Sequence, residues 1–364
     1  MPIIERTHYY AHKGQAAAVL ATRRRASQVR IAEGLPGGEI MIGAKGGDGT
    51  TPDVVWQCVF ADTAAQTADL AARAASAAFE AVRAEMRSHI ARFERQVLAS
   101  ASLNLPSGLR DTAIDGHPIL PRKIAFTSGV HKLLGWLYVP PGPGPFPCLI
   151  TNHGSGIDKG TEDTSRPGTA ALLMSWGIAS FLPHRHGYGA SEGAAWREDV
   201  SAAYGTSDYD AQLATRLDAE SDDILAALDI VAALPEIDAA HIGVMGSSFG
   251  GTTTLLAASK TDRFTCAIDF AGAAMNWDRT PALREVMTTA ALRVKMPIFF
   301  IQADNDYSVR PTLELAAALA GTGQIMQSKV FPAFGVNNHE GHLLESRGPT
   351  VWAAAVRRFL ERYL

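Results

Sequence analysis

The pattern of apolar and polar positions divides the chain into two parts with different element orders. In the first hundred residues, segments rich in β-branched and aromatic residues predict strands, and alanine-rich segments predict helices. The predicted elements are a strand at 3–11, a helix at 15–32, strands at 39–44 and 54–60, a helical stretch from 63 to about 87, and a segment at 89–98 that suits a strand or a helix equally. With a strand at the end, this β-α-β-β-α-β order is that of a ferredoxin-like α+β sheet with helices on one face.

Beyond residue 117, short apolar runs alternate with helical segments. A hairpin is predicted at 123–128 and 132–139, further strands at 148–150, 264–270, 296–302 and 328–331, and a long helix at 212–234. Such alternation is typical of α/β domains, whose mostly parallel sheet carries helices on both faces. The sequence therefore predicts an α+β domain at 1–100, a linker at 101–117 and an α/β domain at 118–364.

A glycine-flanked serine is the most informative position of the second part. An apolar run leads into Gly246-Ser247-Ser248-Phe249-Gly250, and a helix-compatible stretch follows. A serine becomes a useful nucleophile when a sharp strand-to-helix turn projects its hydroxyl, and the crowded turn requires glycine two residues before and two after it. Ser248 is the candidate nucleophile. The same spacing recurs around Ser191, but no strand precedes it and no apolar helix follows, so we interpret Ser191 as a loop residue.

A serine nucleophile requires a histidine base and an acid that orients the base, in the chain order Ser, Asp or Glu, His for an α/β-hydrolase. Asp304 and Asp306 both follow the predicted strand at 296–302, where a carboxylate would lie at the edge of the sheet. They cannot both point at one imidazole. The alternative for Asp304 is a turn residue that caps its own backbone.

Two histidines follow the last predicted strand, His339 and His342. Gly341 would let the loop bend tightly before His342, and an apolar pair after it could anchor the loop. We therefore prefer His342 as the base and interpret His339 as a polar loop residue.

A small-residue turn after the strand at 148–150 supplies candidates for stabilising an oxyanion. The first donor is expected to be the backbone N–H of Phe249, which follows the nucleophile. Gly154 and Ser155 are the candidates for the second, and an ordinary glycine turn is the alternative.

Five stretches of the second part resemble the α/β-hydrolase superfamily and, within it, the dienelactone-hydrolase-like and acyl-peptidase-like branch. They are TNHGSG, RHGYGASEG, VMGSSFGG, QADNDYSV and NHEGH, which occur in the expected order. The resemblance favours Asp306, which is followed by Ser308 and Val309 as in the family pattern. True dienelactone hydrolases use a cysteine, whereas this elbow carries Ser248, so esters or amides are favoured over their lactones.

Composition and charge restrict the partners. Hydrophobic residues make up 47% of 364 residues, and the net charge is −4, so nothing indicates nucleic-acid binding. The cluster Arg23-Arg24-Arg25 is interpreted as a solvated helix face. The paired Asp222 and Asp223 in the predicted long helix are interpreted in the same way.

Localisation and cofactors follow from what the sequence lacks. Cys58, Cys148 and Cys266 lie in apolar runs without a pairing pattern, as expected of buried thiols in a reducing compartment. No secretory or membrane-spanning segment is recognised, which predicts a cytoplasmic, soluble protein. No spacing suggests a metal site, and no cofactor is expected.

Two stretches inserted between core elements, 189–210 and 272–290, are expected to line the binding crevice at the edge of the sheet. Trp196 and Tyr204 in the first, and Trp277 in the second, are candidate contacts for an apolar or aromatic group. The alternative is that these aromatic residues attach the insertions to the core.

The order of the N-terminal elements and the ending FERQVL resemble the small dimeric α+β barrel domains typified by NIPSNAP and antibiotic-biosynthesis monooxygenase proteins. That resemblance implies a homodimer. The function expected for the whole chain is a serine hydrolase that cleaves a small-molecule carboxylic ester. An amidase or exopeptidase with the same three residues, and a non-catalytic dimeric binding protein, are the alternatives.

Overall fold

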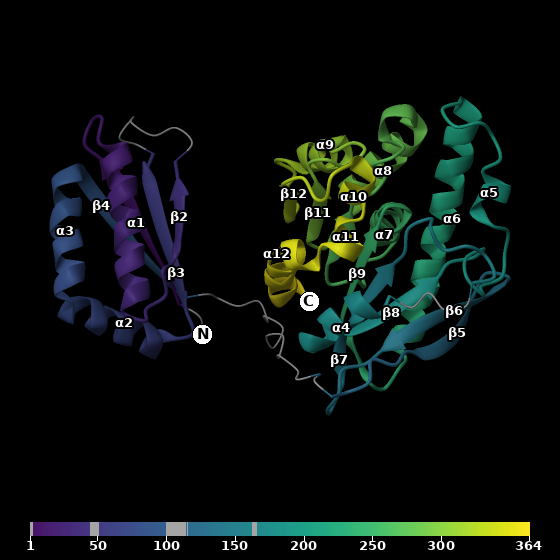
Figure 1. The fold of residues 1–364 in the computed structure, drawn as a ribbon, viewed down its shortest axis with the longest axis horizontal. Helices are drawn as coiled ribbons and strands as arrows, with labels where there is room; N and C mark the ends of the chain where they lie inside the picture. The colour runs from purple at the N-terminus through teal and green to yellow at the C-terminus, as the bar shows by residue number, and fades with distance from the viewer. Residues whose placement is uncertain (1–2, 44–50, 100–113, 115, 162–165) are drawn as a thin grey trace. The chain divides into compact units, whose positions relative to one another are not determined.

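The structure is a computed structural model that describes residues 3–43, 51–99, 114, 116–161 and 166–364. It consists of two compact units, Met1–Asn104 and Leu105–Leu364 (Figure 1). Most of the linker predicted at 101–117 lies outside the described residues.

The first unit is a four-stranded antiparallel sheet with helices packed on one face. Its elements are β1 (Ile3–Ala11), α1 (Ala16–Ala32), β2 (Glu39–Ile42), β3 (Val54–Phe60), α2 (Thr63–Ala75), α3 (Ala77–His89) and β4 (Ile90–Ala99). The strands lie in the order β2-β3-β1-β4. Side chains alternate along β1 and β3, so that Tyr9 and Trp56 join Val19 of α1 and Met86 of α3 in one core. The predicted ferredoxin-like α+β arrangement is confirmed.

The single helical stretch predicted from 63 to about 87 is wrong in one respect, because it is two helices. Ser76 has an extended backbone, with φ −86° and ψ 116°, and it ends α2 and begins α3. Its hydroxyl accepts a hydrogen bond from the N–H of Phe79, which is the usual role of a serine before the first turn of a helix. A serine within an alanine-rich run is therefore a helix boundary here.

The second unit contains an eight-stranded sheet in the order β12-β11-β10-β9-β7-β8-β6-β5. Strands β5 and β6 form the predicted hairpin, β6 pairs antiparallel with β8, and the remaining pairs are parallel. The strands are β5 (Arg122–Ser128), β6 (His131–Tyr138), β7 (Phe146–Asn152), β8 (Ala179–His184), β9 (Ile237–Ser247), β10 (Ala267–Phe270), β11 (Ile298–Ala303) and β12 (Met326–Phe331).

Helices cover both faces of this sheet (Figure 1). One core contains apolar side chains of α6, α7, α8 and α9, and the core on the opposite face contains those of α4 and α12. The helices are α4 (Pro167–Ser175), α5 (Trp196–Asp199), α6 (Ser207–Ala232), α7 (Phe249–Lys260), α8 (Pro281–Arg293), α9 (Arg310–Leu319), α10 (Asn338–His342), α11 (Leu344–Arg347) and α12 (Pro349–Tyr363). The predicted α/β architecture is confirmed, and the loops after β7, β9, β11 and β12 leave the same edge of the sheet.

Candidate active site

Ser248 occupies a strained turn between the end of β9 and the start of α7. Its backbone has φ 60° and ψ −124°, a conformation that non-glycine residues rarely adopt. A Cβ on Gly246 would lie 2.1 Å from the carbonyl oxygen of Gly250, and a Cβ on Gly250 would lie 2.1 Å from that of Asn152. Only glycine fits at both positions, so the turn can be this tight and the hydroxyl of Ser248 projects beyond the backbone.

The side chains of Ser248, His342 and Asp306 form a continuous hydrogen-bonded chain. Nε2 of His342 lies 2.9 Å from Oγ of Ser248, and Nδ1 of the same ring lies 2.8 Å from Oδ1 of Asp306. The carboxylate accepts a hydrogen bond from Nδ1–H of the ring, which leaves Nε2 unprotonated and able to accept the serine proton. Asp306 and His342 are buried, whereas Ser248 is partly accessible.

Further hydrogen bonds orient the acid and join the two loops. The carboxylate of Asp306 accepts from Nε2 of Gln302 at 3.0 Å and from the backbone N–H of Tyr307 at 2.7 Å. The side chain of Asn305 bonds both the N–H and the C=O of Phe334 and also the C=O of Asn337. Asn305 thereby ties the loop that carries Asp306 to the loop that leads to His342.

The candidate oxyanion donors lie beside Ser248. Phe249 is the first residue of α7, so its N–H has no acceptor within the helix. A Cβ on Gly154 would lie 3.2 Å from Cβ of Ser248, which brings the turn that contains Gly154 and Ser155 next to the nucleophile. The start of α7 and the turn after β7 therefore both lie next to Ser248.

His153 holds this turn as a neutral imidazole. Its Nδ1 lies 2.7 Å from the carbonyl oxygen of Gly154, and its Nε2 accepts the N–H of Arg185 at 3.4 Å. These partners require the proton on Nδ1. Burial, reinforced by the charge of Arg185, lowers the pKa of His153 well below its usual value. The sequence did not single out His153, although its place after a buried strand and before two small residues was visible.

Known proteins match the second unit. Residues 165–291 match the prolyl oligopeptidase family. The fold resembles acylaminoacyl peptidase of Pyrococcus horikoshii, with a TM-score of 0.52 and 20% identity over 67% of this chain and 42% of that one. An acylaminoacyl peptidase bound to Z-Gly-Gly-Phe-chloromethyl ketone gives a TM-score of 0.51 and 21% identity over 67% and 41%. The second unit has the α/β-hydrolase fold, and we name it the hydrolase domain after that fold.

The chain spans about two fifths of the length of these peptidases. No curated protein matches it in sequence. The predicted resemblance to the acyl-peptidase-like branch is confirmed by the family match together with the fold. The resemblance of the first unit to NIPSNAP-type domains stays a prediction.

The alternative candidates lie in environments that differ from that of the hydrogen-bonded Ser248, His342 and Asp306. Asp304 and His339 are exposed. Ser191 is buried in the loop after β8, where its hydroxyl donates to the carbonyl of His184 and accepts from the N–H of Leu134. The hydroxyl of Ser191 therefore bonds backbone groups only, and it does not bond a histidine ring.

The three aromatic residues predicted to contact substrate lie in different environments. Trp196 is partly buried, with its ring 5.1 Å from the ring of Phe249. Tyr204 is half exposed, and its hydroxyl donates to the backbone carbonyl of Met275, which joins the two inserted stretches. Trp277 is 1% exposed, and its Nε1 donates to Glu314 of α9. Trp277 therefore attaches the second insertion to the core of the hydrolase domain, which is the alternative role considered for these aromatic residues.

The solvated helix face predicted around Asp222 and Asp223 is wrong for Asp223. Asp223 is buried, and its carboxylate accepts from both the backbone N–H and the ring of His186. One turn earlier, Glu220 is fully buried between Arg185 at 2.6 Å and Arg216 at 2.8 Å. These pairs fasten the loop after β8 to α6. Sequence spacing along α6 does not reveal them, because the partners come from a distant loop.

Among the described residues, no group of three or more His, Cys, Asp or Glu side chains is placed to hold a metal ion. No described helix is long and apolar enough to cross a bilayer. Cys58, Cys148 and Cys266 are buried free thiols, and burial raises the pKa of Cys266 to about 12, which disfavours the reactive thiolate.

Proposed function

We propose that the protein is a serine hydrolase that cleaves a small-molecule carboxylic ester through an acyl-enzyme intermediate. The observation that carries the proposal is the pair of hydrogen bonds at 2.9 Å and 2.8 Å that joins Ser248 to His342 and His342 to Asp306. This geometry gives the serine a base and gives the base a fixed orientation.

The proposed reaction has two halves. Oγ of Ser248 attacks the ester carbonyl while Nε2 of His342 takes the serine proton, and Asp306 stabilises the resulting imidazolium. The N–H groups of Phe249 and Ser155 stabilise the oxyanion. The C–O bond to the alcohol then breaks, and His342 returns the proton to the alcohol as it leaves. Water, activated by His342, attacks the acyl-enzyme and releases the acid.

An amidase or exopeptidase activity is the second candidate. The match of residues 165–291 to the prolyl oligopeptidase family and the likeness to acylaminoacyl peptidases favour it. The same three residues would cleave an amide, with the proton on His342 transferred to the leaving amine. Ester cleavage demands less of this proton transfer, because an alcohol is the better leaving group.

Substitution of the nucleophile tests the proposal. Ser248→Ala is expected to lower kcat by about 10⁴-fold or more, because removal of one member of such a triad disables the whole unit. The measurement is turnover of a panel of esters and aminoacyl anilides that differ in acyl length and leaving group. Preference for esters supports the first candidate, and preference for anilides supports the second.

Ser259→Ala is the matched control, because Ser259 lies in the last turn of α7 and its hydroxyl bonds only the helix carbonyl of Leu256. This control is expected to keep full activity. More than a tenth of wild-type activity in Ser248→Ala would contradict the assignment, and Ser191 would then be tested.

A further inference from the structure

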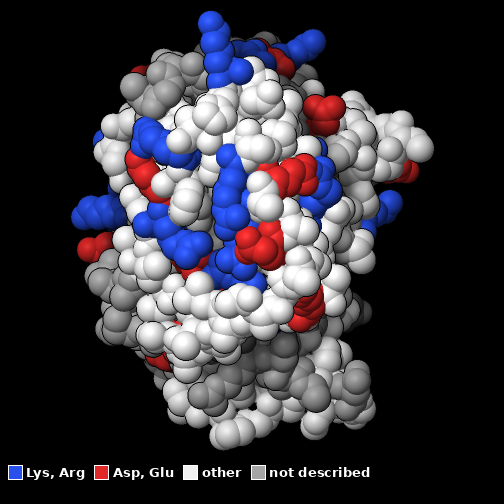
Figure 2. Space-filling model, turned by 90° about the vertical axis from the view of Figure 1, so that its left-hand side faces the viewer, with Lys and Arg blue, Asp and Glu red and all other residues white. Residues whose placement is uncertain are grey.

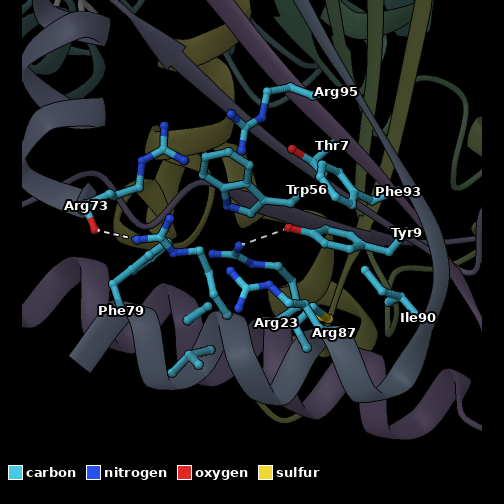
Figure 3. Close-up of a pocket in the computed structure, with 14 residues that line it drawn as sticks. Thr7, Tyr9, Arg23, Trp56, Arg73, Phe79, Arg87, Ile90, Phe93 and Arg95 are labelled. Carbon is cyan, nitrogen blue, oxygen red and sulfur yellow. Dashed lines mark hydrogen bonds between the residues drawn. The ribbon is translucent and has the colours of Figure 1, made fainter. Parts of the chain in front are cut away.

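The first unit contains a pocket of about 240 Å³ between the sheet and helices α1 and α3. Five of the fourteen residues that line it are arginines, and none is acidic. Figure 3 shows Trp56, Tyr9 and Phe93 on the strands, with Arg23 reaching from α1 to the hydroxyl of Tyr9. The pocket thus combines guanidinium groups with aromatic rings, and its lining residues belong to a different unit from Ser248, Asp306 and His342.

Arg23 is the decisive residue of this pocket. The prediction that Arg23 belongs to a solvated helix face is wrong, because only 4% of it is exposed. Its guanidinium donates to the hydroxyls of Tyr9 at 3.3 Å and Ser27 at 3.4 Å, and its Nε has no hydrogen-bond partner. Among the described residues, no carboxylate pairs with Arg23. Burial lowers the pKa of Arg23, as expected for a charge removed from water without a counter-ion.

The side chains around Arg23 carry more positive than negative charges. Arg30 and Arg73 share the carboxylate of Asp69, and Arg73 also pairs with Glu5. Arg95 approaches the same Glu5 at 3.5 Å. The buried carboxylates are thus already shared among these three guanidinium groups. An added anion would therefore find Arg23 without a competing counter-ion.

More arginines surround the opening of the pocket. Arg83 and Arg87 both pair with the half-exposed Glu80 and are themselves partly exposed. Figure 2 shows basic side chains gathered over the middle of this side of the first unit, where they cover more of the surface than the acidic ones. Such a surface attracts small anions toward the pocket.

Aromatic rings supply the apolar part of the site. Trp56 lies at the centre, with the guanidinium carbons of Arg23 and Arg30 each 4.8 Å from its ring centroid. Phe93 lines the pocket from the edge strand β4 and is 54% exposed, so its ring is accessible to a ligand. A planar ligand could pack between these rings and the guanidinium planes, which stack well on flat groups.

We propose that this pocket binds a small aromatic carboxylate, with the carboxylate on the guanidinium of Arg23 and the ring beside Trp56 and Phe93. A volume of about 240 Å³ accommodates one or two fused rings. The carboxylate matches the fork geometry of a guanidinium. It also provides the counter-ion that Arg23 lacks.

Calorimetric titration of the full-length protein tests the proposal. The probes are benzoate and 2-naphthoate, with benzamide as the neutral analogue and inorganic phosphate as the anion without a ring. Arg23→Met is expected to weaken binding of both carboxylates by about tenfold or more, because one charge-assisted hydrogen-bonded contact is lost. Arg24→Met, at the exposed neighbouring position, is the matched control and is expected to bind like the wild type.

Thermal unfolding provides a second readout. Naphthoate should raise the Tm of the wild type and of Arg24→Met, and should raise that of Arg23→Met less at the same concentration. Removal of an unpaired buried charge is itself expected to leave the Tm of the unliganded protein unchanged or higher. Equal carboxylate affinity in all three proteins would overturn the proposal. Phosphate or benzamide binding as tightly as benzoate would also overturn it.

If Arg23→Met does not fold, Phe93→Ala decides the question, since Phe93 lies half exposed on an edge strand. It is expected to weaken naphthoate binding about fivefold, in the range of one lost aromatic contact. Val97→Ala, on the same strand and 52% exposed but outside the pocket lining, is the control. Unchanged affinity in Phe93→Ala would contradict the proposal, whatever Ser248 does in the second unit.

Discussion

Asp269 is a buried acid next to the turn that carries Ser248. It lies on β10 opposite Gly246 of β9, and its Oδ1 accepts the N–H of Gly272 at 2.9 Å. Because a Cβ on Gly251 would lie 2.2 Å from this oxygen, the carboxyl packs tightly against the first turn of α7. Burial raises the pKa of Asp269 from 3.8 to about 7. The neutral acid is therefore the form that the fold favours.

This raised pKa predicts a pH-dependent stability. Between pH 4 and 7 the folded state holds a proton that the unfolded state has lost, so stability falls as the pH rises through this window. The contribution is fully present below about pH 4, and the loss by pH 7 amounts to at most about 4 kcal/mol. Asp269→Asn should flatten the decline in the free energy of unfolding, measured in urea at several pH values.

The exposed Asp262→Asn is the control for this experiment, and it should keep the wild-type slope. If Asp269→Asn showed the same pH dependence as the wild type, Asp269 would not be the group that titrates.

The residue types in a sequence reveal candidate chemistry better than they reveal which side chains are buried. Ser248 could be singled out because the glycines at 246 and 250 are a local requirement of the turn. Arg23 could not, because its neighbours Arg24 and Arg25 are exposed and the three look alike in sequence. What distinguishes Arg23 is the direction of its side chain toward Trp56, and that depends on how α1 packs on the sheet.

At the scale of elements, the loop after β11 and the segment after β12 must be held close together for Asp306 to reach His342. The loop after β11 carries the acid, and α10, which follows β12, carries the histidine. Asn305 joins these loops through three hydrogen bonds to backbone groups of Phe334 and Asn337. In addition, a Cβ on Gly341 would lie 2.6 Å from the side chain of Asn305. The close approach explains why glycine precedes His342.

The Asn305→Ala variant should show whether Asn305 positions the acid and the base or contributes to substrate binding. Loss of the three hydrogen bonds lets the acid and the base drift apart, so kcat is expected to fall about 10- to 100-fold while KM changes little. Steady-state kinetics on the best ester substrate measure this. Asn338→Ala, at an exposed position of α10, is the matched control with wild-type kcat expected. An unchanged kcat in Asn305→Ala would show that these hydrogen bonds do not position the site.

The element order of the first unit and the strand, turn and helix around Ser248 could be predicted from the sequence, because strands, helices and turns leave local patterns. The elements α4, β8 and α12 of the second unit were not predicted. The break at Ser76 could not, because a serine in an alanine-rich run interrupts a helix only where the packing demands a corner. The hydrogen bonds by which Asn305 joins the two loops were also missed, since its partners lie about thirty residues away in the chain.

At the scale of the whole molecule, the described helices of the first unit cover one face of its sheet and leave the other face open. Ile4 of β1 is aligned with Val59 of β3 and with Leu98 of β4 on this face. Val59 is 57% exposed and Leu98 44% exposed. Adjacent exposed apolar side chains on an open sheet face are suited to burial against a second copy, and the homodimer stays a prediction.

Val59→Arg tests this dimer. A charge placed in line with the apolar side chains of Ile4 and Leu98 should dissociate the dimer, because burial of an unpaired charge is costly. Sedimentation velocity measures the change in mass. Val130→Arg, at an exposed turn of the hydrolase domain, is the control and should remain dimeric. A wild type that sediments as a monomer would contradict the prediction at once.

The central claim is that Ser248 is an activated nucleophile, and labelling with a fluorophosphonate tests it most directly. Intact-mass analysis of the full-length protein should show one adduct on the wild type and none on Ser248→Ala, because only a serine with an assembled base reacts readily. Absence of an adduct on the folded wild type would contradict the claim and would favour a dimeric binding protein. An adduct that persists in Ser248→Ala would place the nucleophile elsewhere.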